Sequence, residues 1–320
     1  MIGQRAQANP LFAAENACMP HPRARRQPVS SSAIAAVSAA FGSNVDGCLA
    51  QVEQTVRSAR ERGAGLVVFP EAALGGYMHE EQVGAAVRRS SPAVLEHRDA
   101  VFARLARIAG PTVVCIGYTE SAPGGPDRIF SSAVCISGDG VLGHHRKVHI
   151  PPGEHGIYTA GDEFAAFDTP VGRLGMLICY DKVFPEAARA LALDGAEIVA
   201  CMAAWPVCRL RPARLMRNDR QVKHFNALDI ARAVENQVVW VASNLYGSLG
   251  RLRFPGQAKV VDPDGRVLSS TGARAGTALA RIDVRATVQA ARGEISHLGD
   301  RVPMTYVSDI PAARPVASAA

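Results

Sequence analysis

The chain has 320 residues, of which 48% are hydrophobic, and it carries a formal charge of +6. This composition is that of a soluble globular protein, and no apolar run approaches the roughly 20 residues that span a bilayer, so we expect a cytoplasmic protein without a membrane partner. The basic excess lies near the N-terminus and in segment 209–223. Because neither stretch is interleaved with aromatic residues or belongs to a known module, we expect no nucleic-acid partner.

The first half of the chain predicts alternating strands and helices. Residues 1–30 contain four prolines and no periodicity, which indicates a loosely ordered extension. After them we predict a strand, a helix ending at Gly63 and a short buried strand ending at Glu71. A further helix and strand follow. The ranges of these elements are 32–41, 45–63, 64–71, 92–108 and 111–120.

The second half predicts two hairpins among further strand and helix units. Asp139-Gly140 and Pro263-Asp264-Gly265 are the turn signals. Pro185 suits the first turn of a helix, and Gly195 its end. Because such hairpins are not part of a purely parallel sheet, we expect sheets packed face to face with helices outside. The predicted elements are strands at 128–137, 140–150, 172–179, 196–204, 238–244 and 277–284, helices from 185 and at 225–237, and the hairpin 256–271.

The seven cysteines indicate neither a disulfide framework nor a zinc site. Their number is odd, the chain is long and no CxxC pair occurs. Cys115, Cys135 and Cys201 lie inside apolar runs and are interpreted as buried small hydrophobes. We therefore expect no metal site.

Three polar residues, Glu71, Lys147 and Cys179, each follow a strand-like apolar run. Strand ends fix side chains rigidly, which is why α/β proteins place chemistry there. A cysteine hydrolase needs a thiolate, a group that takes and returns a proton, and donors for the developing oxyanion. We therefore predict Cys179 as nucleophile, Glu71 as a desolvated base and Lys147 as the cation that stabilises thiolate and oxyanion.

The turn after Cys179 predicts a second oxyanion donor, the backbone N–H of Tyr180. A helix N-terminus there would also lower the pKa of the thiol. Each residue has an ordinary alternative when taken alone: a surface carboxylate, a surface lysine or a core cysteine. A Cys–His pair also stays open, because several histidines lie near these motifs and the sequence does not show which of them faces Cys179. They are His144, His145, His149 and His155.

Several separated motifs resemble the nitrilase, or carbon–nitrogen hydrolase, superfamily. "VVFPEAALGGY" (67–77) resembles its glutamate motif, "HRKVHIP" (145–151) its lysine motif and "GMLICYDKVFPEAARALALDGAEIV" (175–199) its cysteine motif. Within 151–164, Glu154 matches the family's second active-site glutamate. Segments 227–244 and 256–268 resemble its Arg-Ala-x-Glu-Asn helix and its late hairpin. The motifs occur in order across about residues 31–285.

The resemblance implies an α/β fold, a four-layer α-β-β-α sandwich, with a homodimer or higher homo-oligomer and no cofactor. It places a hydrolase domain at 31–288 and a C-terminal tail at 289–320 that packs at an oligomer interface. It also implies a thioester mechanism, in which Glu71 moves protons, Lys147 and the Tyr180 N–H hold the oxyanion, and Glu154 orients substrate or water.

The residues around the nucleophile favour an amidase or carbamoylase. Nitrilases of the family tend to carry Cys-Trp-Glu, whereas this chain has Cys179-Tyr180-Asp181. We expect hydrolysis of a linear amide or an N-carbamoyl compound; a nitrilase and a non-catalytic scaffold protein are the alternatives. Val183 stands where ω-amidases often have arginine and where D-amino-acid carbamoylases have one of two arginines, which disfavours a strict dicarboxylate monoamide or carbamoyl amino acid.

The expected substrate-binding residues come from the same motifs and from the basic segment. Tyr77 and Trp205 are candidates for the pocket walls, and Lys182 for binding a substrate carboxylate. We also expect one of Arg209, Arg211 and Arg214 to bind an acidic group of the substrate, because the family's pocket borders this segment. The expected binding residues are Tyr77, Tyr180, Lys182, Trp205 and Arg209.

Overall fold

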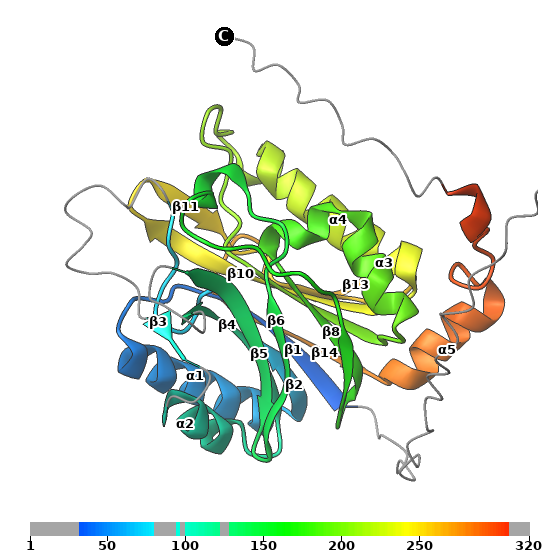
Figure 1. Ribbon diagram of the computed structural model, residues 1–320, viewed down its shortest axis with the longest axis horizontal. Coiled ribbons are helices and arrows are strands. Elements are labelled where there is room, and N and C mark those ends of the chain that lie inside the picture. The colour runs from blue at the N-terminus through cyan, green and yellow to red at the C-terminus, as the bar shows by residue number, and fades with distance from the viewer. Residues whose placement is uncertain (1–31, 80–93, 97–99, 122–127, 307–320) are drawn as a thin grey trace, which may run out of the picture.

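The strands of the protein share one hydrogen-bonded network, which runs in the order β6-β5-β4-β2-β1-β10-β9-β8-β7 (Figure 1). The computed structural model describes residues 32–79, 94–96, 100–121 and 128–306. Off this path, β11 and β12 pair with β10, β13 pairs with β12, β14 pairs with β1 and β3 pairs with β4. The strands are β1 Ser32–Ala39, β2 Ala64–Val68, β3 Val94–Leu95, β4 Val113–Ser121, β5 Ile129–Ser137, β6 Gly140–Arg146, β7 Ala166–Thr169, β8 Gly172–Ile178, β9 Ile198–Ala203, β10 Val239–Leu249, β11 Leu252–Pro255, β12 Lys259–Val261, β13 Val267–Ser270 and β14 Gly276–Ile282.

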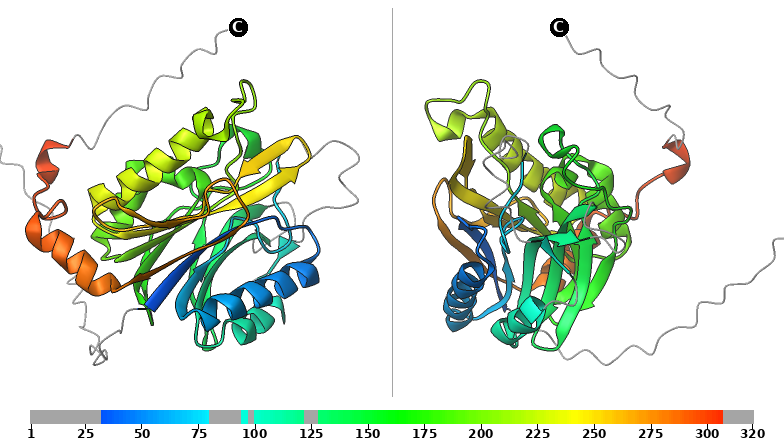
Figure 2. Two further views of the ribbon diagram at one scale, coloured as in Figure 1. Left: turned by 180° about the vertical axis from the view of Figure 1, so that it is seen from behind. Right: turned by 60° about the vertical axis from the view of Figure 1, so that its left-hand side comes forward.

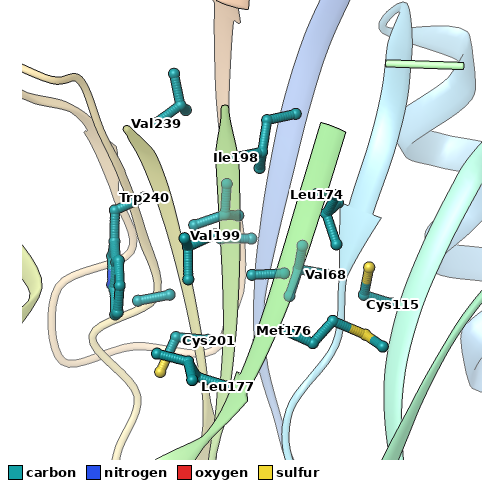
Figure 3. Packing of buried hydrophobic residues seen from close by; sticks show 14 of the residues in the cluster. Val68, Cys115, Leu174, Met176, Leu177, Ile198, Val199, Cys201, Val239 and Trp240 are labelled. Atoms are coloured by element: carbon teal, nitrogen blue, oxygen red, sulfur yellow. The ribbon is translucent and has the colours of Figure 1, made fainter. Parts of the chain in front are cut away.

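The sheet has two halves, one containing β2 and β4 and the other containing β8, β9 and β10. Side chains of the two halves pack against each other, so that each half is buried on both faces. In β2, Leu66 and Val68 belong to a core shared with β8 and β9, while Val67 between them belongs to a second core under two helices. Figure 3 shows Val68 and Cys115 beside Met176 in the shared core. Alternate residues point to opposite faces of a strand, so a continuous apolar run is what a doubly covered strand requires.

Two pairs of helices cover the outer faces of the sheet halves (Figures 1 and 2). Helices α1 (Val45–Glu61) and α2 (Ala100–Ala109) pack on the half that contains β2 and β4. Helices α3 (Pro185–Leu193) and α4 (Arg220–Asn236) lie against the half that contains β8, β9 and β10. The predicted α/β fold, a four-layer α-β-β-α sandwich, is confirmed.

The strand directions gather several strand ends at one edge of the sandwich. Strands β2, β1, β10, β9 and β8 run parallel to one another. Strand β4 is parallel to β2, and two antiparallel steps through β5 give β6 the same direction. The carboxyl ends of β2, β6, β8 and β9 therefore share an edge, and Glu71, Lys147, Cys179 and Ala204 follow them directly.

The structure differs from the predicted elements in several places: α4 begins at Arg220 rather than at 225, and strands β7 and β11 were not predicted. Within the predicted helix 92–108, Val94–Leu95 forms strand β3 beside β4, and the described helix begins at Ala100. The tail prediction missed helix α5 (Val284–Glu294), which is capped by the Asp283 carboxylate accepting from the Ala286 N–H. The hairpin of β12 and β13 is confirmed.

The predicted terminal extensions fall largely outside the described residues. Residues 1–31 and 307–320 belong to them, so the loosely ordered extension and the interface role of the tail stay predictions. None of the helices in the described part of the chain is long and apolar enough to cross a membrane.

Candidate active site

Glu71 lies in a tight turn after β2 that packs directly on the backbone of β4. Its side chain is fully buried. One carboxylate oxygen, Oε1, accepts from Ser131 at 3.0 Å and from Lys147 Nζ at 2.9 Å. The other, Oε2, accepts from the backbone N–H of Ala204 at 2.9 Å. Three separate strand ends therefore fix the orientation of this carboxylate.

Lys147 is a fully buried ammonium held between two carboxylates. Besides Glu71, it donates to both oxygens of Glu154, at 2.8 and 2.7 Å. The Tyr77 hydroxyl donates to Glu154 Oε1 at 2.6 Å. Burial alone would lower the pKa of Lys147, but Glu154 and Glu71 outweigh it and raise the pKa well above its usual range. Burial in turn raises the pKa of Glu154.

Cys179 occupies a strained turn between β8 and a short 3-10 helix (Cys179–Val183). Its backbone φ is +48°, in the left-handed region that residues other than glycine rarely adopt. The side chain is 5% exposed and faces the Ala204 N–H as well as the charges of Glu71, Lys147 and Glu154. The structure therefore brings Glu71, Lys147, Cys179 and Glu154 together.

The thiol of Cys179 holds its proton more tightly than the sequence predicted. Burial raises its pKa well above the usual range, and the negative charge of Glu71 adds to this, whereas Lys147 opposes it. A thiolate here would be a third negative charge around one ammonium. The predicted lowering of the thiol pKa by a helix N-terminus is wrong, because α3 begins only at Pro185 and burial dominates.

Asp181 ties the turn of Cys179 to the segment that carries Lys147. Its buried carboxylate accepts from the Ile178 N–H at 3.1 Å and the His149 N–H at 2.9 Å. It also contacts the rings of His145 and His149, at 3.1 and 2.9 Å. These bonds hold the pKa of Asp181 well below its usual range against the opposing effect of burial. Two of the four histidines considered as partners of Cys179 therefore bind Asp181 instead.

A cavity of about 880 Å³ opens above these residues. Cys179 and Glu154 lie in its wall, together with the predicted binding residues Tyr77, Tyr180, Trp205 and Arg209. Arg211 and Arg214 are exposed and do not line it. Within the described residues, no group of three or more His, Cys, Asp or Glu side chains could hold a metal ion.

Lys182 does not line this cavity, contrary to the prediction that it binds a substrate carboxylate. It is fully buried, and its Nζ donates to Asp229 Oδ1 at 2.8 Å and lies 3.1 Å from the ring centre of Phe225. Lys259 pairs with the other oxygen of the same carboxylate. The side chain points away from the cavity because Asp229 of α4 lies beneath the turn of Cys179.

Gly117 of β4 gives a test of how closely the Glu71 turn must fit. A Cβ at this position would lie 2.5 Å from the Ala72 nitrogen and 2.7 Å from the Glu71 Cα. Gly117→Ala is expected to displace Glu71 and lower kcat on the order of tenfold to a hundredfold, because small misplacements of reacting groups are costly. It should also lower the free energy of unfolding by about 1–3 kcal/mol through overpacking.

The matched control for this substitution is Gly293→Ala. Gly293 lies in α5, and apart from its chain neighbours and the nearby backbone of its own helix no described heavy atom lies within 4 Å of an added Cβ. Alanine there is expected to leave kcat unchanged and to raise stability slightly, because glycine is unfavourable inside a helix. Steady-state kinetics and urea unfolding measure both variants, and a Gly117→Ala enzyme with undiminished kcat would contradict the argument.

Comparison with known proteins decides the family. Residues 33–292 match the model of the carbon-nitrogen hydrolase family. The chain belongs to the carbon–nitrogen hydrolase family. The resemblance predicted from the motifs is confirmed, and so is the prediction that the protein is an enzyme of this class.

Curated relatives of this carbon–nitrogen hydrolase include proteins named for different substrates. A nitrilase of Pyrococcus abyssi is 32% identical over 68% of this chain and 76% of its own. An (R)-stereoselective amidase of a Pseudomonas species is 31% identical over 74% and 79%. An N-carbamoylputrescine amidase of Solanum tuberosum is 30% identical over 75% and 81%.

Solved structures similar to this carbon–nitrogen hydrolase include several of an amidase. An amidase from Nesterenkonia sp. has a TM-score of 0.68 and 25% identity, with 86% of this chain and 95% of that chain covered. A second structure of that amidase, a glutamate-to-glutamine mutant, shows covalent addition of the acetamide moiety of fluoroacetamide at the active-site cysteine. An active-site cysteine is thus shown in a structural relative of the chain.

The sequence reasoning missed several residues of this carbon–nitrogen hydrolase site. Ser131 holds Glu71 from β5, which is distant in sequence, and no local pattern marks it. Asp181 stands inside the cysteine motif, but the motif does not show that its carboxylate ties this turn to His149. Arg220 and His224 line the cavity at the start of α4. The basic segment 209–223 contained a usable signal, because Asp219 caps α4 and so places Arg220 in its first turn.

Proposed function

We propose that this enzyme hydrolyses a small linear amide or an N-carbamoyl compound, with Cys179 as the nucleophile. The observation that supports the proposal most strongly is the buried, hydrogen-bonded cluster of Glu71, Lys147 and Glu154 beside a thiol that lines an 880 Å³ cavity. The cluster supplies an acceptor and a donor for protons and a fixed cation, which are the groups that acyl transfer through a thiol needs.

In the proposed first half-reaction, Glu71 takes the proton of Cys179 as the sulfur attacks the substrate carbonyl. Because the pKa of the thiol is raised, proton transfer accompanies attack rather than preceding it. Lys147 and the Tyr180 N–H stabilise the oxyanion. Glu71 then returns the proton to the leaving nitrogen, the C–N bond breaks, and an amine or ammonia departs, which leaves a thioester on Cys179.

In the proposed second half-reaction, water attacks the thioester. Glu71 accepts a proton from this water and gives it to the departing sulfur of Cys179. Glu154, held by Lys147 and Tyr77, orients the water or the substrate. An amide then yields a carboxylic acid, and a carbamoyl compound yields carbamic acid, which decomposes to carbon dioxide and ammonia.

The amide and carbamoyl substrate classes are supported by relatives, which are named (R)-stereoselective amidase and N-carbamoylputrescine amidase. The mutant Nesterenkonia amidase carries the acetamide moiety of fluoroacetamide bound covalently to its active-site cysteine. Because another relative is named nitrilase, the test also includes nitriles as substrates.

The test is product release from a panel of linear amides, ureido compounds and nitriles. The proposal predicts ammonia or an amine from amides, or ammonia together with carbon dioxide from ureido compounds. Ammonia from nitriles alone would replace it with a nitrilase, and no release from any compound would overturn it.

A further inference from the structure

The segment between β9 and α4 forms a loop that a single carboxylate closes at its base. Asp219, the N-cap of α4, is buried and accepts from the backbone N–H groups of Cys208 and Ala213, at 3.1 and 3.4 Å, as well as from the first turn of the helix. The loop of residues 208–219 projects from the body of the molecule where α4 begins (Figures 1 and 2). Surface loops whose ends lie close together frequently have a function of their own.

The loop and the first turn of α4 carry a strong positive charge. Residues 208–223 contain six basic side chains and one acidic side chain, Asp219, whose carboxylate is buried and bound to backbone N–H groups. Arg211, Arg214 and Arg217 are exposed, and within the described residues no ion pair or hydrogen bond holds their guanidinium groups. Their charge is therefore directed to the solvent.

The hairpin of β10 and β11 extends this basic surface. The Val207 N–H, just before the loop, donates to the Arg253 carbonyl oxygen at 2.9 Å, so the two segments lie side by side. Arg251 and Arg253 of the hairpin are both exposed. Because like charges repel, such a surface is suited to an anionic partner that spans several of these side chains.

Leucine side chains stand between the arginines of the loop. Leu210 is 89% exposed and lies between Arg209 and Arg211 in the sequence. Leu215 is 45% exposed and follows Arg214 directly. Single exposed leucines are ordinary, but two on one projecting loop, each beside arginines, give the loop an apolar tip within a basic rim.

This combination fits the surface of an anionic lipid bilayer better than a nucleic acid or another protein. In segments that bind membrane surfaces, apolar side chains enter the headgroup region while basic side chains bind the lipid phosphates. Single-stranded nucleic acids are bound by aromatic side chains that stack on the bases, and residues 206–223 contain no aromatic residue. The strongest contacts between proteins come from tryptophan, tyrosine and arginine, and leucine is under-represented among them.

We propose that loop 208–219 binds the surface of an anionic phospholipid membrane, with Leu210 and Leu215 in the headgroup region and the neighbouring arginines on lipid phosphates. The expectation that the protein has no membrane partner rested on the lack of an apolar spanning run, which binding at a membrane surface does not need. Arg209 and Leu210 also line the cavity above Cys179, so membrane binding places that wall of the cavity next to the bilayer. This binding is independent of the proposed reaction.

Co-sedimentation of the full chain with lipid vesicles tests the proposal. Vesicles of phosphatidylglycerol and phosphatidylcholine in equal parts are expected to bind the protein roughly tenfold or more tightly than vesicles of phosphatidylcholine alone. Added salt should weaken the binding, because it screens the charges of the exposed arginines. No binding to the anionic vesicles, or equal binding to both kinds of vesicle, would overturn the proposal.

Removal of two loop charges tests where the membrane binds. Arg211→Gln combined with Arg214→Gln should weaken binding to the anionic vesicles about thirtyfold, since each basic residue near such a surface contributes about fivefold. The matched control combines Arg57→Gln with Arg107→Gln, which removes the same charge from exposed positions in α1 and α2 on the other half of the sandwich. Equal losses in both proteins would assign the binding to net charge and overturn the role of the loop.

Replacement of the apolar tip tests the contact with the headgroup region. Leu210→Gln should weaken vesicle binding roughly tenfold through the lost apolar burial, with unchanged circular dichroism because the side chain is exposed. Leu193→Gln, at a 51% exposed position of α3, is the matched control and should bind like wild type. Undiminished vesicle binding by Leu210→Gln would overturn the proposal. So would tighter binding to an RNA oligonucleotide than to vesicles, or a dimer that Leu210→Gln dissociates, because the loop would then serve a nucleic acid or a second copy of the chain.

Discussion

Replacement of Cys179 by alanine is expected to lower amide or carbamoyl hydrolysis to background, a loss of roughly 10⁴-fold or more. The remaining Glu71 and Lys147 have no nucleophile to activate, and the cluster beneath the cavity offers no second thiol in the same position. Cys135→Ala is the matched control, because Cys135 is buried in β5 and does not line the cavity. Residual activity above a few per cent in Cys179→Ala would contradict the assignment.

Glu71→Gln tests the base in the same experiment. Glutamine keeps the shape of the side chain and the acceptor for Ser131, but it can take neither the thiol proton in the first half-reaction nor the water proton in the second. We expect both half-reactions to slow, so that the acyl adduct on Cys179 forms slowly and then persists, detected as a mass increase of the intact protein after long exposure to substrate. Rapid turnover without an adduct would show that another group moves the protons.

Asp229→Ala is expected to lower the free energy of unfolding by about 3–5 kcal/mol. The Asp229 carboxylate is fully buried between two ammonium groups, Lys182 and Lys259, and accepts from Trp240 Nε1 at 2.9 Å. Its pKa is held below the usual range by the two lysines, against the effect of burial. Removing it leaves two buried cations facing each other, and burial together with Lys182 already lowers the pKa of Lys259 to about 8.

The loss should also reach the active site, because this cluster lies under the turn of the nucleophile. Lys182 belongs to that turn, and Arg232 of α4 donates to the carbonyl oxygens of Lys182 and Val183, both at 2.9 Å. The activity of Asp229→Ala is therefore expected to be reduced even at urea concentrations below the unfolding midpoint, where the variant is still folded. Urea unfolding followed by circular dichroism gives the stability.

The control for this prediction is an exposed ion pair of the same type. Asp46 pairs with Arg104, and its side chain is 80% exposed. Asp46→Ala should change stability by less than about 1 kcal/mol, because surface pairs contribute little. If Asp229→Ala does not fold, Asp229→Asn keeps an acceptor and is expected to lose less; equal stability of wild type, Asp229→Asn and Asp46→Ala would contradict the argument.

Local sequence patterns were sufficient where a residue's environment follows from its own segment. The run Ala33–Val37 is buried on both faces and forms β1, and the 3–4 spacing of Leu49, Val52 and Val56 places them on the buried face of α1. The same patterns failed at Val94–Leu95, where pairing with β4 overrides helix propensity. They also failed at Lys182, since position next to the nucleophile does not determine which way a side chain points.

By itself, the sequence determined the family, the layer architecture and the candidate residues for the proposed chemistry, because motifs and strand periodicity are properties of short segments. Only the tertiary structure decided that Glu71, Lys147 and Glu154 share hydrogen bonds, that the thiol pKa is raised, and that Lys182 pairs with Asp229 while Arg220 lines the cavity. The physical reason is that distances, burial and charge pairing between distant segments depend on strand order and direction, which no single segment encodes.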